Sequence, residues 1–221
     1  MQCRQRHCSS NTRKHTMTTI SIIGSGNMAE AIGTRAAKHG HIVELLSRST
    51  DKAQALAERI GHGAFVGTYG SQPAGDIVIV AILYADAVDV VAHHGEALAG
   101  KVLVDITNPF NADASGLVTT PGDSMAHRIA AVAPADTHVV KAFNTILGTV
   151  LAEDGPLDGF IAGDDAASKA MVAEFLESIG MQPRDAGGIG MAHALEWAGI
   201  LLVGLANNGA GFNSALGLEV R

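Results

Sequence analysis

A short apolar strand, a glycine-rich turn and an alanine-rich helix, in that order, constrain the fold of this chain most. Residues 20–29 are ISIIGSGNMA, so the apolar run ends in the pattern Gly24-x-Gly26-x-x-Ala29. The first glycine permits a sharp turn, the second lets backbone N–H groups approach a pyrophosphate, and the small third residue keeps the helix near the sheet. Phosphates bind at the N-terminus of such a helix. The pattern therefore predicts a dinucleotide site at Gly24, Ser25, Gly26, Asn27 and Met28.

The end of the second predicted strand indicates which dinucleotide binds. An NAD site commonly places Asp or Glu about 20 residues beyond the glycines, where the carboxylate binds the ribose 2′-hydroxyl. Here the strand at residues 41–46 ends in Ser47-Arg48-Ser49-Thr50, and Lys52 follows one turn later. A guanidinium and hydroxyl groups suit a 2′-phosphate. The same hydroxyls are also good caps for the next helix, and the two roles are compatible. We therefore expect NADP(H) rather than NAD(H).

Continuous apolar runs predict the rest of the sheet. Residues 77–82, 101–105 and 138–142 are apolar at nearly every position, which is typical of strands that are covered on both faces. Helical patterns separate them, as in repeated βαβ units with right-handed crossovers. The fold class is therefore α/β, a Rossmann-type, doubly wound, mostly parallel sheet over residues 17–150.

Residues 151–221 are predicted to form a small αβ extension of this domain. The expected elements are a strand at 159–163, a helix at 165–179, a strand at 181–185 and a long helix at 189–207. Gly199 and Gly204 lie inside the long helix, where each costs about 1 kcal/mol relative to Ala. They predict close packing against the sheet, a ligand or a second subunit. A homodimer through this helix is one expected arrangement.

Composition excludes several classes of protein. The net charge of −7 argues against a nucleic-acid partner. No apolar run approaches the 18 residues of a membrane span, the longest being residues 199–206, so no membrane association is expected. Both cysteines and four uncompensated cations fall in residues 1–16, which are predicted to be a disordered extension or a targeting segment. No metal site is expected, and a cytoplasmic location is predicted because the remaining chain has no cysteine.

With these residues placed, the chain resembles the NADP oxidoreductase family typified by the deazaflavin (coenzyme F-420)-dependent NADP reductases. The resemblance extends from residue 19 to residue 221. It rests on GSGNM at 24–28, on Ser47-Arg48 with Lys52, on KVLVDITNP at 101–109, on VVKAFNTI at 139–146, on AGDD at 162–165 and on DAG at 185–187. The DITNP and VVKAFN segments are also similar to the cytosolic reductase domain of the six-transmembrane metalloreductases.

The resemblance implies hydride transfer between NADP(H) and a flat redox ring, a deazaflavin or a flavin-like acceptor. Such a step needs close approach and exclusion of water more than an acid or base, so no acid–base residue is required. The extension would complete the pocket of this small-molecule acceptor. The implied contacts of the nicotinamide half are Ile82, Leu83, Tyr84, Val88, Asn108, Pro109, Phe110, Asn144 and Gly148.

Several residues near the expected nicotinamide have more than one interpretation. Tyr84 is a candidate to stack on the nicotinamide or on the acceptor. Lys141 and Asn144 could orient a carboxamide or an acceptor oxygen, or could satisfy nearby backbone groups. His193 and Glu196 lie on one helical face, as a proton relay or as an ordinary surface pair.

The chain departs from the deazaflavin enzymes in two loops, and this leaves the acceptor open. Leu83-Tyr84 and Ile146-Leu147 stand where those enzymes tend to carry prolines, so a deazaflavin, a flavin, a quinone and a small carbonyl or imine all remain candidates. The segment GNMAEAI at 26–32 also resembles the start of pyrroline-5-carboxylate reductases. Those enzymes continue into a longer helical dimerisation domain. A further alternative is a non-catalytic NADPH-binding module for sensing or electron delivery.

Overall fold

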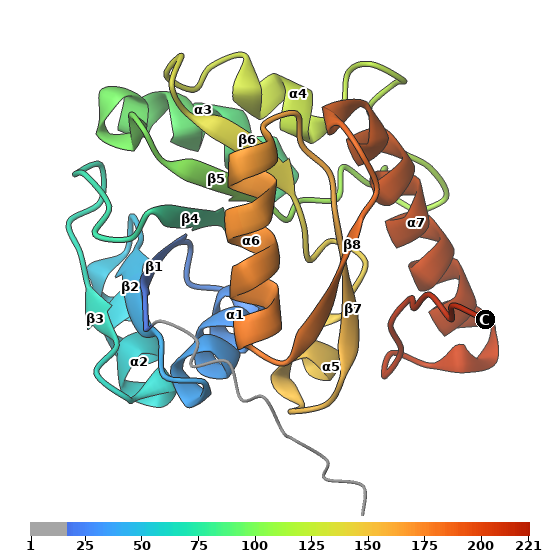
Figure 1. Ribbon diagram of the computed structural model, residues 1–221, viewed down its shortest axis with the longest axis horizontal. Helices are drawn as coiled ribbons and strands as arrows, with labels where there is room; N and C mark the ends of the chain where they lie inside the picture. The colour runs from blue at the N-terminus through green and yellow to red at the C-terminus, as the bar shows by residue number, and fades with distance from the viewer. Residues whose placement is uncertain (1–16) are drawn as a thin grey trace, which may run out of the picture.

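The structure, a computed structural model, describes residues 17–221, so the predictions for residues 1–16 lie outside it. Six parallel strands form the main sheet in the order β3-β2-β1-β4-β5-β6, and β7 and β8 form a second parallel sheet (Figure 1). This order is the Rossmann topology that the glycine pattern predicts. The strands are β1 (Thr19–Ile23), β2 (Ile42–Leu46), β3 (Phe65–Val66), β4 (Ile77–Val80), β5 (Val102–Asp105), β6 (His138–Lys141), β7 (Leu157–Ile161) and β8 (Met181–Asp185).

Helices cover both faces of the main sheet. Side chains of α1, α2, α5 and α6 share one hydrophobic cluster with the sheet, and side chains of α3 and α4 share another. The helices are α1 (Asn27–Lys38), α2 (Thr50–Ile60), α3 (Tyr84–His94), α4 (Met125–Ala130), α5 (Gly148–Ala152), α6 (Ala166–Ser178) and α7 (Ala192–Leu205). Shorter helical turns are η1 (Gly95–Leu98), η2 (Ile189–Met191) and η3 (Ala206–Ala210).

The sequence IVIV of β4 shows why the sheet has two apolar faces. Ile77 and Ile79 belong to the cluster under α1 and α2, whereas Val78 and Val80 belong to the cluster under α3 and α4. All four are at most 5% exposed. Burying each such side chain stabilises the fold by about 1.5–3 kcal/mol. An unbroken apolar run is therefore needed at the centre of this sheet.

The C-terminal extension joins the main sheet at the end of β6. Lys141 and Ala162 form an antiparallel bridge, with N···O distances of 2.8 and 3.1 Å. Helix α6 packs on the same hydrophobic cluster as α1. The strand, helix and strand expected after residue 150 are all present. The five-residue α5, which spans residue 150, was not predicted, because so short a helix leaves no clear period in the sequence.

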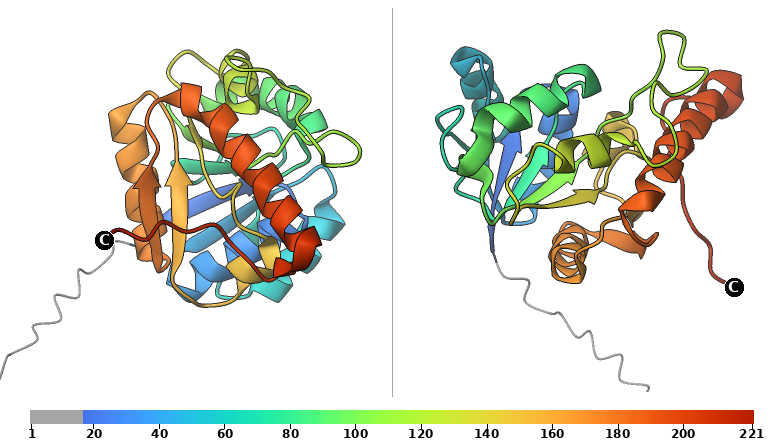
Figure 2. Two further views of the ribbon diagram at one scale, coloured as in Figure 1. Left: turned by 90° about the vertical axis from the view of Figure 1, so that its right-hand side faces the viewer. Right: turned by 90° about the horizontal axis from the view of Figure 1, so that it is seen from above.

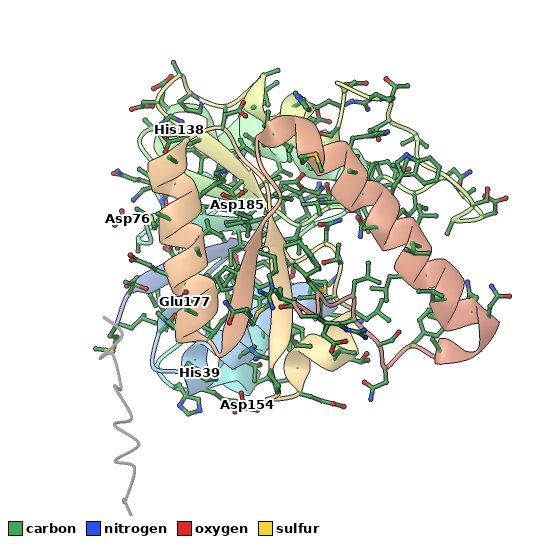
Figure 3. All side chains as sticks on the ribbon, turned by 45° about the vertical axis from the view of Figure 1, so that its right-hand side comes forward. His39, Asp76, His138, Asp154, Glu177 and Asp185 are labelled. Atoms are coloured by element: carbon green, nitrogen blue, oxygen red, sulfur yellow. The ribbon has the colours of Figure 1, made fainter. Side chains whose placement is uncertain are left out.

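The last helix crosses the side of the molecule to which the strands run (Figure 2). Asp76 and His138 lie at the amino ends of β4 and β6, and Figure 3 shows both on the side opposite α7. The carboxyl ends of these strands therefore face α7. Ligands of open parallel sheets bind at this edge.

One helical stretch of the structure bears on the expectation about apolar runs. The helical stretch Ile189–Ala210 contains an 18-residue window with a mean hydropathy of 1.6 and is long enough, by length and composition alone, to cross a membrane. Ala192, Glu196 and Leu202 on one of its faces are at most 2% exposed because they pack against the fold. Core helices of soluble proteins share this composition, so the stretch is weak evidence for a membrane span.

Candidate functional site

The glycine turn after β1 has the geometry that a pyrophosphate site needs. Gly24 has φ of +133°, and a Cβ there would lie 2.2 Å from the carbonyl oxygen of Ala81. No other residue type fits this position. Gly26 is the N-cap of α1 and provides no side-chain acceptor. The first N–H groups of α1 therefore remain available to an anion, beside the exposed Asn27 and the half-buried Ser25 and Met28.

The end of β2 lies directly beside this turn. Ser47 Oγ is 3.2 Å from Ser25 Oγ, and the backbone N–H of Ser49 donates to Ser47 Oγ at 3.2 Å. Ser49 caps α2 by accepting from the backbone N–H of Lys52. The capping role therefore falls on Ser49, and Ser47 remains a candidate for the predicted phosphate role.

Arg48 extends from the end of β2 toward α3. Its Nη2 donates to Asp86 Oδ2 at 3.0 Å, and both side chains are largely exposed. Glu44, the nearest acid in β2, is 4% exposed and accepts from Ser21 Oγ and from the backbone N–H of Ala74. It therefore cannot bind a ribose. The structure places a cation, and no free carboxylate of β2, where the ribose would lie.

Tyr69 is a member of this site that sequence reasoning missed. Its ring stacks on His93, with centroids 5.0 Å apart, and meets His94 edge-on at 4.8 Å. Burial raises the pKa of the Tyr69 phenol, and the charges of Arg48 and Asp86 act on it in opposite directions. The aromatic residue in the loop after β3 was the available signal, since that loop begins at the same edge of the sheet.

At the ends of β5 and β6, two asparagines bind each other. Asn108 Nδ2 donates to the Asn144 carbonyl at 2.8 Å, and Asn144 Nδ2 donates to Asn108 Oδ1 at 3.0 Å and to the Leu195 carbonyl at 2.7 Å. A Cβ at Gly199 would lie 2.8 Å from Asn108 Oδ1, so Gly199 lets α7 approach this pair. Gly204 has nothing within 4 Å of its Cβ position. Close packing thus explains Gly199 and leaves Gly204 unexplained.

Lys141, the last residue of β6, has the second of its two predicted roles, the satisfaction of nearby groups of the protein. Its side chain is fully buried, and Nζ donates to Asp105 Oδ2 at 2.8 Å, to the Thr107 carbonyl and to Glu196 Oε1 at 3.3 Å. All three ammonium protons therefore have acceptors inside the protein. Lys141 thus fixes the ends of β5 and β6 to α7.

Glu196 is likewise buried, so its interpretation as part of a surface pair was wrong. Besides Lys141, it accepts from Thr119 Oγ1 at 3.0 Å and from the backbone N–H of Met125 at 2.9 Å. His193 Nδ1 lies 3.6 Å from Glu196 Oε2, which is too far for a hydrogen bond. The sequence could not reveal this burial, because the spacing of the pair on the helix fits either face.

The other predicted nicotinamide contacts lie on loops at the same edge. Leu83 is 77% exposed and precedes α3, whose first residue is the half-buried Tyr84. Pro109 is buried, and a Cβ at Gly148 would lie 3.2 Å from Met28 Sδ. The partly exposed members of the predicted set at this edge are Ile82, Tyr84, Val88, Asn108, Phe110 and Gly148.

The residues at this edge fit a dinucleotide. The Gly24 cradle has no room for a Cβ, and α1 lacks a side-chain cap. Within residues 17–221, the buried Thr107 Oγ1, Asn144 Oδ1 and Thr145 Oγ1 have no hydrogen-bond partner, although all three lie just past β5 and β6. A carboxamide offers both donors and acceptors to such atoms.

A pocket adjoins the middle of this edge. Its volume is about 580 Å³, within the range of small-molecule sites. It lies between α1 and α5 under the C-terminal segment, which Thr149 Oγ1 holds by donating to the Phe212 carbonyl at 2.8 Å. The lining residues are Asn27, Met28, Glu30, Ala31, Thr34, Leu147, Gly148, Thr149, Ala152 and Phe212.

Comparison with known families agrees with this geometry. Residues 19–109, which contain the glycine turn, Arg48 and the Asn108 loop, match the family described as "NADP oxidoreductase coenzyme F420-dependent". The chain is therefore similar to this family over these residues. The match ends at residue 109 and does not reach the extension.

Relatives of the NADP oxidoreductase family extend the match further. The chain is 31% identical over 181 residues to the metalloreductase STEAP3 of Rattus norvegicus, covering 80% of this chain and 35% of the relative. It therefore spans about a third of that protein. The F420-dependent NADP reductase of Methanocaldococcus jannaschii is 28% identical, over 84% of this chain and 91% of the relative.

Solved structures show the same fold. A crystallised Arthrobacter protein described as a candidate F420-dependent NADP reductase superposes with a TM-score of 0.78 at 24% identity, over 92% of this chain and 100% of that one. A reductive aminase from Aspergillus terreus, solved with NADPH, gives a TM-score of 0.64 at 25% identity, over 89% of this chain and 63% of that one. The Rossmann domain and the extension thus recur together in the Arthrobacter protein.

Proposed function

We propose that this chain is an NADPH-dependent oxidoreductase that transfers hydride between NADP(H) and a flat ring such as a deazaflavin or flavin. One observation carries the proposal: Met28 and Gly148, at the phosphate turn and after β6, are also walls of the 580 Å³ pocket. A cofactor bound along the predicted edge would thus lie next to a space of ring size. Hydride transfer requires this proximity, with the reacting carbons about 3–3.5 Å apart.

In this proposal, a bound NADPH supplies the hydride, and the residues of the chain bind and orient the cofactor. The N-terminus of α1 and Arg48 bind the phosphates, and the Asn108–Asn144 pair defines the far end of the edge. The apolar part of the pocket wall, which includes Met28, Leu147 and Phe212, would help to exclude water from a bound ring. Lys141 and Glu196 are enclosed by their own partners, so the reaction is not assigned an acid or base.

The names of relatives support a flavin-like acceptor and also suggest a second candidate. Two relatives are F420-dependent NADP reductases, at 28% identity. Several structural neighbours are imine reductases or reductive aminases bound to NADPH or a related nucleotide. Reduction of an imine is therefore the second candidate function. The chain covers 63% of the reductive aminase and 62% of one imine reductase.

Oxidation of NADPH, followed by its absorbance, tests the proposal. The purified protein is mixed with a panel of deazaflavin, flavin, quinone and imine acceptors. We expect turnover with deazaflavin or flavin. Turnover with imines alone would favour the second candidate. No turnover with any acceptor, together with tight binding of NADPH, would indicate a non-catalytic binding module.

Arg48→Ala tests the cofactor assignment within the same assay. A hydrogen bond to a charged group contributes about 1.5–3 kcal/mol, so the KM for NADPH should rise roughly ten- to hundredfold while that for NADH changes little. Arg59→Ala is the matched control, because Arg59 is an exposed arginine at the other end of α2 that binds Glu30. An equal loss with both nucleotides would contradict the 2′-phosphate assignment.

A further inference from the structure

The ion pair between Arg48 and Asp86 spans the adenosine end of the predicted cofactor edge. Arg48 follows β2, and Asp86 lies in the first turn of α3, which follows β4. Their 3.0 Å contact thus joins the two loops between which an adenosine would lie. The side chains of Arg48 and Asp86 are 68% and 48% exposed, so the pair lies at the surface of the predicted site and is open to solvent.

A 2′-phosphate would need the same guanidinium. In the structure, Nη2 of Arg48 is held by Asp86, while its Nε and Nη1 form no hydrogen bond to any described residue. Lys52, the other cation expected at the phosphate, forms no ion pair within residues 17–221. A phosphate bound to Arg48 would therefore approach the carboxylate of Asp86, and two anions would share one cation.

We propose that Asp86 is a specificity-determining residue that competes with the 2′-phosphate of NADP(H) for Arg48. The proposal rests on the function proposed above and adds a role for a residue outside the glycine turn and the end of β2. The carboxylate lowers the affinity for nucleotides that carry a 2′-phosphate and leaves the affinity for those that lack it nearly unchanged. It thereby limits the preference for NADP(H) over NAD(H) and speeds release of the oxidised cofactor.

The surroundings keep this carboxylate in place. The next residue of the helix, Ala87, is fully buried, so the backbone of Asp86 cannot move away from Arg48. Tyr69, in the loop after β3, lies close enough for the charges of both Arg48 and Asp86 to act on the pKa of its phenol. An exposed ion pair is weak, so its loss on phosphate binding is a modest but measurable cost.

Two nucleotides that differ only in the 2′-phosphate measure the effect directly. Isothermal titration with 2′,5′-ADP and with 5′-ADP requires no acceptor and no turnover. For Asp86→Asn we expect 2′,5′-ADP to bind about two- to fivefold more tightly and 5′-ADP to bind as before. The tighter binding should disappear in the double variant Arg48→Ala/Asp86→Asn when it is compared with Arg48→Ala alone.

Asp89→Asn is the matched control, because it removes the same charge from the same helix one turn further on. Asp89 is exposed and forms no ion pair among the described residues. If Asp89→Asn increased the affinity for 2′,5′-ADP as much as Asp86→Asn does, the effect would come from the overall charge of the protein, and the proposal would be overturned. Weaker or unchanged binding of 2′,5′-ADP by Asp86→Asn would also overturn it. Failure of every variant to bind either nucleotide would instead contradict the proposed function.

Discussion

At the scale of single residues, Gly199 determines whether α7 can reach the cofactor edge. In Gly199→Ala the new methyl group would lie 2.8 Å from Asn108 Oδ1, so the Asn108–Asn144 pair must shift. We expect kcat to fall at least tenfold with little change in the KM for NADPH, because the phosphate end is untouched. Steady-state kinetics measures both constants.

Gly204→Ala provides the control for this prediction. Its Cβ would point into open space, so the variant should keep full activity. Replacing a helical glycine by alanine should also raise the free energy of unfolding by up to about 1 kcal/mol. Unchanged kcat in Gly199→Ala, with a normal unfolding curve, would show that the asparagine pair does not position the reactants.

Among the elements, α1 is joined to the C-terminal extension through one buried side chain. Arg35 is 2% exposed, and burial lowers its pKa. It donates to carbonyl groups in the turns that follow α5 and α6, namely to Ile179 at 2.7 Å, Glu153 at 2.8 Å and Gly155 at 2.7 Å. Arg35→Met fills a similar volume but leaves these carbonyls without the donor. Unfolding in urea should show a loss of about 2–4 kcal/mol, whereas Arg59→Met should lose under 1 kcal/mol.

Helix α3 holds the Tyr69 loop through a neutral histidine. His94 Nε2 accepts from the backbone N–H of Gly70 at 3.3 Å, and Nδ1 lies 2.9 Å from the Val90 carbonyl, which requires the Nδ1–H form. Burial holds the pKa of His94 below its ordinary value. The unfolded chain therefore binds more protons below about pH 6.5, and stability falls as pH decreases toward the folded pKa. His94→Gln should flatten this part of the curve of unfolding free energy against pH, and an unchanged slope would contradict the assignment.

The sequence predicted the helices and strands that follow a strong local pattern. It did not predict the ion pairs that depend on tertiary packing. The strand IVIV and the turn at Gly24 each have a local physical cause, so their places were predictable. The burial of Glu196 is different, because it follows from Lys141 and from the N–H of Met125, which are far away in the sequence. The Arg48–Asp86 contact likewise depends on how α3 lies beside β2. Local pattern thus located the cofactor edge but did not identify which charged groups meet there.

At the scale of the whole molecule, α7 closes the fold over the strand ends. Glu196 binds the end of β6 through Lys141, and the Leu195 carbonyl binds Asn144. The same helix leaves its other face open, where Trp197, Leu201 and Leu205 are 47%, 56% and 46% exposed. One helix therefore connects the site to an apolar surface that a partner could cover.

We expect a second copy of this chain to cover that face. Helices that bind membrane surfaces carry Lys or Arg on their polar face, whereas α7 (Ala192–Leu205) has neither, and the chain is acidic overall. In a symmetric dimer, the same apolar face of each copy would be buried against that of the other copy. Sedimentation equilibrium should give a dimer, and Leu201→Glu should convert it to a folded monomer, because two buried carboxylates would then face each other. Ile42→Glu, at an exposed apolar residue of β2, is the control and should remain dimeric. A monomeric wild-type protein that co-sediments with phosphatidylcholine vesicles would assign the face to a membrane instead.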